Sequence, residues 1–121
     1  MKHYHERFEW AVEAMEVRAA DRMVEIGCGV GFAVEAIVPL LDTGMIIAID
    51  KSATAIKRAV ERNETSVAQG KAKFLQVELL KLPKQWRKYN KVFCFNVNFF
   101  WTQKSTASEC TIIRFILSTN G

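Results

Sequence analysis

Three glycines stand at alternate positions in the stretch VEIGCGVGF, which runs from Val24 to Phe32. Gly27, Gly29 and Gly31 follow an apolar run, so they come where a short strand would end and a helix would begin. Because glycine has no Cβ, the backbone there can turn tightly and a ligand can approach it closely. One glycine would indicate no more than a tight turn, but three at this spacing predict a ligand-binding loop.

The charges near this loop indicate which ligands would suit it. No Lys or Arg lies between Gly27 and Asp50, whereas Glu25, Asp50 and Glu78 lie at or near the expected strand ends. A pyrophosphate needs backbone N–H donors and tolerates few nearby anions, so a ligand rich in hydroxyl groups, amines and positive charge fits better. Asp50 is placed to accept hydrogen bonds from both hydroxyl groups of a ribose.

A nicotinamide-dependent oxidoreductase is the first alternative, because Asp50 alone would also suit NAD. The dinucleotide fingerprint, however, is G-x-G-x-x-G. Phe32 occupies the position of its last glycine. The glycine spacing and the two further carboxylates therefore disfavour this alternative.

The rest of the chain shows alternating strand and helix patterns. Apolar stripes at helical spacing predict helices over residues 3–18, 33–41, 53–63 and 108–117. Apolar runs predict strands over residues 22–26, 45–50, 73–77 and 91–97. The first strand is expected to be buried apart from Glu25. Ser52 is expected to cap the helix over residues 53–63. A polar loop is expected to lead into the third strand, and the order of elements predicts an α/β domain with a parallel sheet.

Length and composition limit the class of protein. The 121 residues suffice for one domain, and a chain that is 50% hydrophobic and 25% charged is typical of globular proteins. No apolar run approaches the roughly 20 residues of a spanning helix, and the charged N-terminus has no signal-peptide pattern. The three cysteines show neither metal-ligand nor redox-pair spacing. We therefore expect a cytoplasmic protein with reduced thiols, no membrane partner and no bound metal.

The net charge of +4 is concentrated in one segment. Between residues 71 and 91 the sequence has one acid, Glu78, and seven basic residues, which are Lys71, Lys73, Lys81, Lys84, Arg87, Lys88 and Lys91. Such a patch could contact nucleic acid. A solvated helix face or loop is the simpler interpretation, because no recognition motif accompanies the charges.

Taken together, these motifs resemble those of the class I S-adenosylmethionine-dependent methyltransferases. VEIGCGVG resembles their first motif, hydrophobic-Glu-hydrophobic-Gly-x-Gly-x-Gly, and GMIIAIDKS resembles their second strand with its ribose-binding acid. FLQVELLKLP resembles their third motif, F-x-x-G-D-A-x-x-L-P, and KVFCFNV stands where their fourth strand lies. The resemblance covers roughly residues 3–121. It implies a Rossmann-like sheet, S-adenosyl-L-methionine as cofactor and methyl transfer as activity.

The resemblance also implies roles for the first motif. The backbone of Gly27, Cys28 and Gly29 would line the methionine end of the cofactor, and Gly31, which completes the motif, would also belong to the cofactor-binding residues. Glu25 would orient the methionine ammonium group. Methyl transfer from a sulfonium requires alignment above all, and the sequence assigns no residue as a catalytic base.

Further roles are implied downstream. Asp50 would hold the ribose and Lys51 would flank the adenine. The adenine would be framed by Val77, Glu78 and Leu79, with Glu78 accepting from its exocyclic amine. Val77 and Glu78 stand where Gly-Asp is usual, so this motif departs from the family pattern. Asn96 would face the methionine amine or the substrate.

The sheet of this family has seven strands in the order 3-2-1-4-5-7-6, and the resemblance ends before the fifth. The expectation is therefore an incomplete sheet of the first four strands, in the order 3-2-1-4. It would form one partial methyltransferase domain over residues 1–121, with an N-terminal helix over residues 3–18 and a cofactor-binding half over residues 22–121. The acceptor would most simply be a small molecule, whose identity the sequence does not indicate.

The apolar stretch FCFNVNFFW would then form an unpaired sheet edge, which proteins avoid. One hypothesis is a homodimer through this fourth-strand edge. A second hypothesis is that the chain is a truncated gene product. A third is that it is a non-catalytic S-adenosylmethionine-binding fragment or a dimerisation module.

Overall fold

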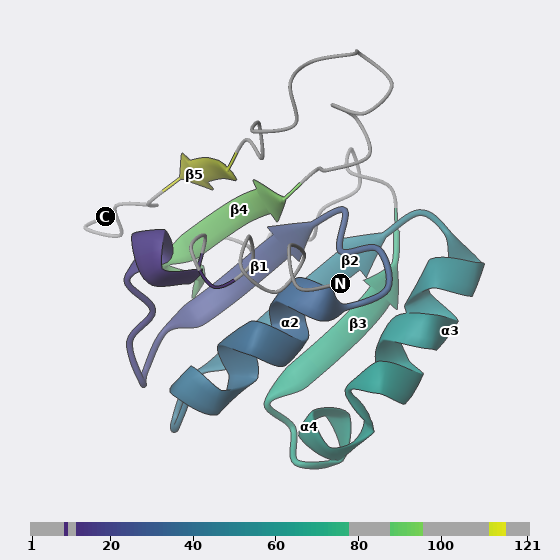
Figure 1. The fold of residues 1–121 in the computed structure, drawn as a ribbon, viewed down its shortest axis with the longest axis horizontal. Helices are drawn as coiled ribbons and strands as arrows, with labels where there is room; N and C mark the ends of the chain where they lie inside the picture. Colours follow the sequence, from purple (N-terminus) through teal and green to yellow (C-terminus); the bar gives the residue numbers. More distant parts are fainter. Residues whose placement is uncertain (1–8, 10–11, 78–87, 96–111, 116–121) are drawn as a thin grey trace.

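The fold, in a computed structural model, is described for residues 9, 12–77, 88–95 and 112–115 (Figure 1). Its elements in chain order are β1 (Arg22–Ile26), α2 (Phe32–Ile37), the 3-10 helix η1 (Val38–Leu40), β2 (Met45–Asp50), α3 (Ala53–Arg62), α4 (Glu64–Ala68), β3 (Ala72–Gln76), β4 (Lys91–Phe95) and β5 (Ile112–Phe115).

The strands form one sheet in the order β3-β2-β1-β4-β5. β1 pairs in parallel with β2 and with β4, and β2 pairs in parallel with β3. The predicted Rossmann-like sheet with strand order 3-2-1-4 is confirmed. In such a sheet the carboxyl ends of the strands meet at one edge, where ligands bind.

Local sequence signals account for several boundaries. β1 and β2 have the predicted bounds, because each apolar run is flanked by polar residues or glycine. Ser52 caps α3 as predicted, since its Oγ accepts the backbone N–H of Ala55 at 3.1 Å. α3 ends at Arg62, with Asn63 as its C-cap.

One predicted helix is wrong. Residues 112–115, within the helix expected over residues 108–117, form β5, which pairs antiparallel with β4. The isoleucines and phenylalanine of this segment favour a strand, and β4 offers an unpaired edge for it. The premise of the dimer hypothesis is therefore wrong as well, because the outer edge of β4 already has a partner within the chain (Figure 1).

Other boundaries differ by smaller amounts. The first helix was predicted to reach residue 18, but residues 12–15 are helical and Glu16 leaves the helix with a φ of 52°. The second α-helix ends at Ile37, and a 3-10 turn follows; Pro39 has no N–H to continue the α-helical hydrogen bonds. The short helix α4 replaces the expected polar loop before β3.

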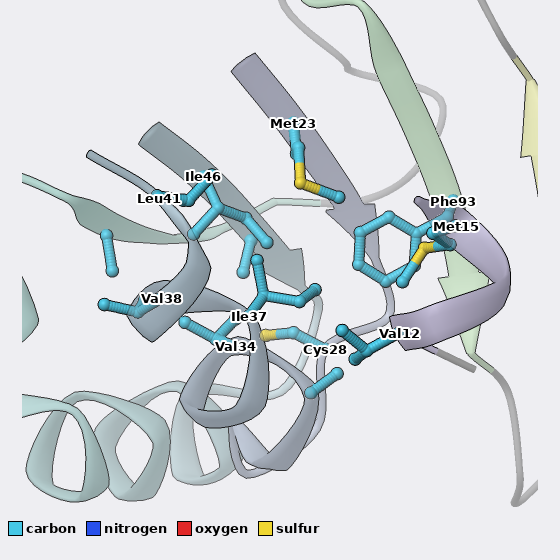
Figure 2. Close-up of a cluster of buried hydrophobic side chains, with 13 residues drawn as sticks. Val12, Met15, Met23, Cys28, Val34, Ile37, Val38, Leu41, Ile46 and Phe93 are labelled. Carbon is cyan, nitrogen blue, oxygen red and sulfur yellow. The ribbon is translucent and has the colours of Figure 1, made fainter. Parts of the chain in front are cut away.

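The main core lies on one face of the sheet (Figure 2). Met23, Ile46 and Phe93 project from three adjacent strands toward Val34 and Ile37 of α2. Val12 and Met15 belong to the same cluster, and Ile56 of α3 and Val67 of α4 pack against it. On the opposite face lies a smaller cluster made of Val24, Val92 and Tyr89.

Among the described residues, no helix is long and apolar enough to cross a membrane.

A buried ion pair ties the N-terminal segment to the amino ends of β1 and β4. Lys91 Nζ lies 2.6 Å from Asp21 Oδ2 and donates to the carbonyl of Glu16 at 2.7 Å. The Asp21 carboxylate also accepts from the Arg18 N–H and from Asn90 Nδ2, both at 2.7 Å. Burial alone would raise the pKa of Asp21, but these hydrogen bonds and the Lys91 charge lower it below its usual value. The pair is therefore structural, at the end of the sheet opposite the glycine loop.

Candidate cofactor site

The glycine loop joins the end of β1 to α2 in a conformation that few other residues adopt. Gly27, Gly29 and Gly31 have φ values of 75°, 57° and 88°, all in the left-handed region. The N–H groups of Gly27 and Cys28 both donate to the carbonyl of Ile49, at 2.8 and 2.9 Å. These two bonds hold the loop against the carboxyl end of β2.

The three glycines serve two purposes. A Cβ at Gly27 or Gly29 would meet no described atom within 4 Å. A Cβ at Gly31 would lie 2.7 Å from Asn63 Nδ2 and 3.1 Å from Ala59. Among the described residues, Gly27 and Gly29 therefore leave open space beside the backbone, where a ligand can approach. Gly31 instead lets the loop pack against α3.

Gly31→Ala should therefore destabilise the fold by about 2–4 kcal/mol, because a strained φ adds to an overpacked contact. Gly70→Ala is the matched control, since Gly70 has a φ of 79° with no described atom in the way. It should cost about 1–2 kcal/mol from the φ alone. Urea unfolding of both variants measures the difference. Equal losses would contradict the packing role of Gly31.

Asn63 is a site residue that sequence reasoning missed. Its side chain is buried, and Nδ2 donates to the carbonyls of Gly31 at 3.2 Å and Ala59 at 3.0 Å. It thereby joins the end of α3 to the glycine loop. Phe32 stands at the last fingerprint position. The guanidinium carbon of Arg62 lies 3.9 Å from the centroid of the Phe32 ring, over its face. The residue that argues against a dinucleotide site thus contributes to the contact between α2 and α3.

Asp50 lies at the rim of the loop, where the sequence predicted a ribose-binding acid. Its Oδ2 accepts the N–H of Gly29 at 2.8 Å, and its Oδ1 accepts the N–H of Ser52 at 2.9 Å. An ionised carboxylate can accept about four hydrogen bonds, so each oxygen keeps room for a further donor. The backbone thus holds the carboxylate in place for a ligand, and the carboxylate in turn fixes the loop.

Glu25 is buried, contrary to the expectation that it would be the exposed residue of β1. Its exposed fraction is 2%, and its neighbours in register are Ala48 of β2 and Phe93 of β4. Its Oε1 is buried without a hydrogen-bond partner among the described residues. Burial, and next the charge of Asp50, raises the pKa of Glu25 to about 8. Glu25 was wrongly expected to be exposed because β1 is a central strand, with β2 on one side and β4 on the other.

The cysteines near the site are poor nucleophiles. Cys28 and Cys94 are both free. Burial, followed by the charges of Glu25 and Asp50, raises the pKa of the Cys28 thiol. Burial and the Glu25 charge raise the pKa of Cys94 in the same way. Both thiols therefore stay protonated at neutral pH, and neither supplies a thiolate to the site.

Two more predicted residues lie beside the end of β2. The N–H of Val77 donates to the carbonyl of Asp50 at 3.0 Å. Lys51 is exposed, and its carbonyl accepts from Gln76 Nε2 at 3.3 Å. Glu78, Leu79 and Asn96 lie outside the described residues, so their roles stay predictions.

A hollow of about 270 Å³ also lies away from this loop, between η1 and the α3–α4 pair. Its lining includes Val38, Pro39 and residues 61–66, and none of the loop glycines. The hollow is open and polar, and it contains neither Asp50 nor Glu25. We therefore place the candidate site at the glycine loop, from its backbone geometry and its two acidic residues, and not at this hollow.

Comparison with known proteins places this geometry in a family. A family model described as a methyltransferase domain matches residues 23–117. That span contains the glycine loop, Asp50 and the four parallel strands except Arg22, the first residue of β1. A search of curated proteins found no significant match.

Solved structures share the fold. A S-adenosylmethionine-dependent methyltransferase from Aquifex aeolicus is 18% identical, with a TM-score of 0.64 over 85% of this chain and 52% of its own. One from Thiobacillus denitrificans, in complex with S-adenosylhomocysteine, is 19% identical, with a TM-score of 0.64 over 78% of this chain and 37% of its own. The YcgJ protein from Bacillus subtilis is 22% identical, with a TM-score of 0.60 over 74% of this chain and 37% of its own.

The chain thus spans between 37% and 52% of the length of these three structures. At these identities they show the fold alone, and the family rests on the match to the methyltransferase-domain model. Sheet order, glycine loop and family match agree with one another. The chain belongs to the class I S-adenosylmethionine-dependent methyltransferase family.

Proposed function

We propose that this chain binds S-adenosylmethionine at the carboxyl ends of β1 and β2 and serves methyl transfer to a small-molecule acceptor. The observation that carries this proposal is the open backbone at Gly27 and Gly29 beside the Asp50 carboxylate. When bound, the cofactor supplies an electrophilic methyl group on a positively charged sulfur.

The residues present suit such a cofactor. Asp50 has lone pairs left for the two hydroxyl groups of a ribose, and it is already oriented by two backbone N–H groups. Glu25 offers a buried oxygen without a described partner, which suits the methionine ammonium group. Two acidic side chains beside the same loop favour a cationic ligand over a phosphate.

The contribution of the chain would be alignment. The bonds from Gly27 and Cys28 to the Ile49 carbonyl fix the loop from below, and the bond from Gly29 to Asp50 fixes its rim. A loop held in this way loses little entropy when a ligand binds. A fixed cofactor lets an acceptor approach in line, which is the main requirement of a displacement reaction.

A nucleic-acid acceptor is less well supported, because part of the basic segment over residues 71–91 serves the fold. Lys71 Nζ donates to the carbonyl of Leu41 at 3.1 Å, and Lys91 is buried against Asp21. Lys73 and Lys88 are exposed. Cofactor binding without turnover of any acceptor would instead support the alternative of a non-catalytic binding module.

Gly29→Ala tests the site. The added methyl group would enter the open space beside the loop, so we expect the affinity for S-adenosylhomocysteine to fall at least about tenfold, or about 1.4 kcal/mol. Gly70→Ala introduces a methyl group at a similar positive φ, in the turn between α4 and β3. It should leave the affinity unchanged. Calorimetry on the wild type and both variants measures this, and equal affinities in all three would contradict the proposed site.

A further inference from the structure

The two carboxyl groups at the candidate site, those of Asp50 and Glu25, have very different hydrogen-bond partners. Asp50 accepts two backbone N–H groups, at 2.8 and 2.9 Å. Glu25 has an exposed fraction of 2%, and its Oε1 has no described hydrogen-bond partner. An unpaired anionic oxygen at such a position is costly. The backbone donors therefore stabilise the charge on Asp50 and leave Glu25 without comparable support.

The surroundings of Glu25 offer no compensating cation among the described residues. Within the described part of the chain, the titratable groups that interact with it are Asp50 at the end of β2, Cys28 in the loop and Cys94 on β4. Ala48 and Phe93 flank it in register on the two neighbouring strands. A buried carboxyl group beside a second, half-buried one favours a state in which the buried group keeps a proton. The burial of Glu25 and its unpartnered Oε1 make Glu25 the group that holds that proton, in agreement with a pKa of about 8.

We propose that Glu25 holds a proton in the free protein at neutral pH and releases it to solvent when the cationic amino-acid end of the cofactor binds. The inference rests on the proposed function, because it needs an ammonium group at this site. On binding, the O–H bond of Glu25 breaks, the proton passes to the buffer and the carboxylate pairs with the ammonium group. Cofactor binding is then coupled to pH through one residue.

The size of the coupling follows from the protonated fraction. With a pKa of about 8, Glu25 carries about 0.9 proton in the free protein at pH 7. Each binding event should release close to that amount. The observed affinity should accordingly rise nearly tenfold for each pH unit between pH 6 and pH 7.

Calorimetry with S-adenosylhomocysteine at pH 7, in phosphate and in Tris, measures the released protons from the difference in heat between the two buffers. The wild type should release about 0.9 proton, and Glu25→Gln should release none. Glu61→Gln makes the same chemical change at an exposed position of α3 and should behave as the wild type. The nucleoside 5′-methylthioadenosine, which lacks the amino-acid end, should bind without proton release.

A second readout does not depend on whether Glu25→Gln binds the ligand. The infrared spectrum of the wild type should show the carbonyl stretch of a protonated carboxyl group, which disappears when S-adenosylhomocysteine is added and is absent from Glu25→Gln. If the ligand binds the wild type with equal heat in both buffers, the inference is wrong and the proposed function stands. If it does not bind at all to the folded chain, both are wrong. Loss of proton release in Glu61→Gln would contradict the assignment to Glu25.

Discussion

Glu25→Gln should stabilise the free protein at pH 8 by about 3–5 kcal/mol and should have little effect near pH 4.5. The pKa of Glu25 is raised from 4.5 to about 8 in the folded protein, first by burial and then by the charge of Asp50. Between these two values the folded state holds a proton that the unfolded state has released. Raising the pH across this window therefore favours unfolding, by up to about 1.4 kcal/mol for each pH unit.

Urea unfolding at several pH values between 4.5 and 8 measures this effect. The free energy of unfolding of the wild type should fall with pH relative to that of Glu25→Gln, because glutamine is neutral throughout. Glu61→Gln, at an exposed position, should follow the wild type. Parallel profiles for the wild type and Glu25→Gln would contradict the raised pKa. The expected result means that the buried acid lowers the stability of the free protein at a place where a cationic ligand would restore it.

Lys91→Met should destabilise the fold by about 3–5 kcal/mol, because it leaves the buried Asp21 carboxylate without its cation. Lys91 Nζ lies 2.6 Å from Asp21 Oδ2, and both residues are less than a tenth exposed. The same lysine bonds the carbonyl of Glu16, so the change also loosens the N-terminal segment. Lys73→Met, on the exposed side of β3, is the matched control and should change stability by less than about 0.5 kcal/mol.

The measurement is urea unfolding at pH 7, and equal midpoints for the two variants would contradict the role of the ion pair. Acid should lower the free energy of unfolding of the wild type in a separate pH range. Because the pKa of Asp21 is lowered below 3.8, its contribution is present above that value and is lost as the pH falls through the folded-state pKa. The effects of Asp21 and Glu25 on stability therefore occupy different pH windows.

Much of the parallel sheet was predictable, because its signals are local. MIIAID is an apolar run bounded by Gly44 and Lys51, and Ser52 opens the next helix with an Oγ that can reach the Ala55 N–H. The position of Asp50 beside the glycine loop follows from its place at the end of β2. The strand order came from the resemblance to a family rather than from these signals.

The errors have a common physical cause, which is contact between segments distant in sequence. The run from Ile112 to Phe115 fits a helix or a strand by periodicity alone, and pairing with β4 decides the outcome. Glu25 was assigned to solvent because its neighbours on β2 and β4 cannot be read from its own strand. The roles of Asn63 and Gly31 likewise depend on how α3 packs against the loop.

The proposed site requires an adenosyl ligand to lie against the backbone of Gly27 and Gly29, beside which no described atom lies within reach of a Cβ. The most direct measurement is a titration of the ¹⁵N-labelled chain with S-adenosylhomocysteine, followed through the backbone amide resonances. We expect the resonances of Gly27, Gly29 and Asp50 to shift and that of Gly70 to stay unchanged. Unchanged resonances at both loop glycines under a saturating concentration of the ligand would contradict it.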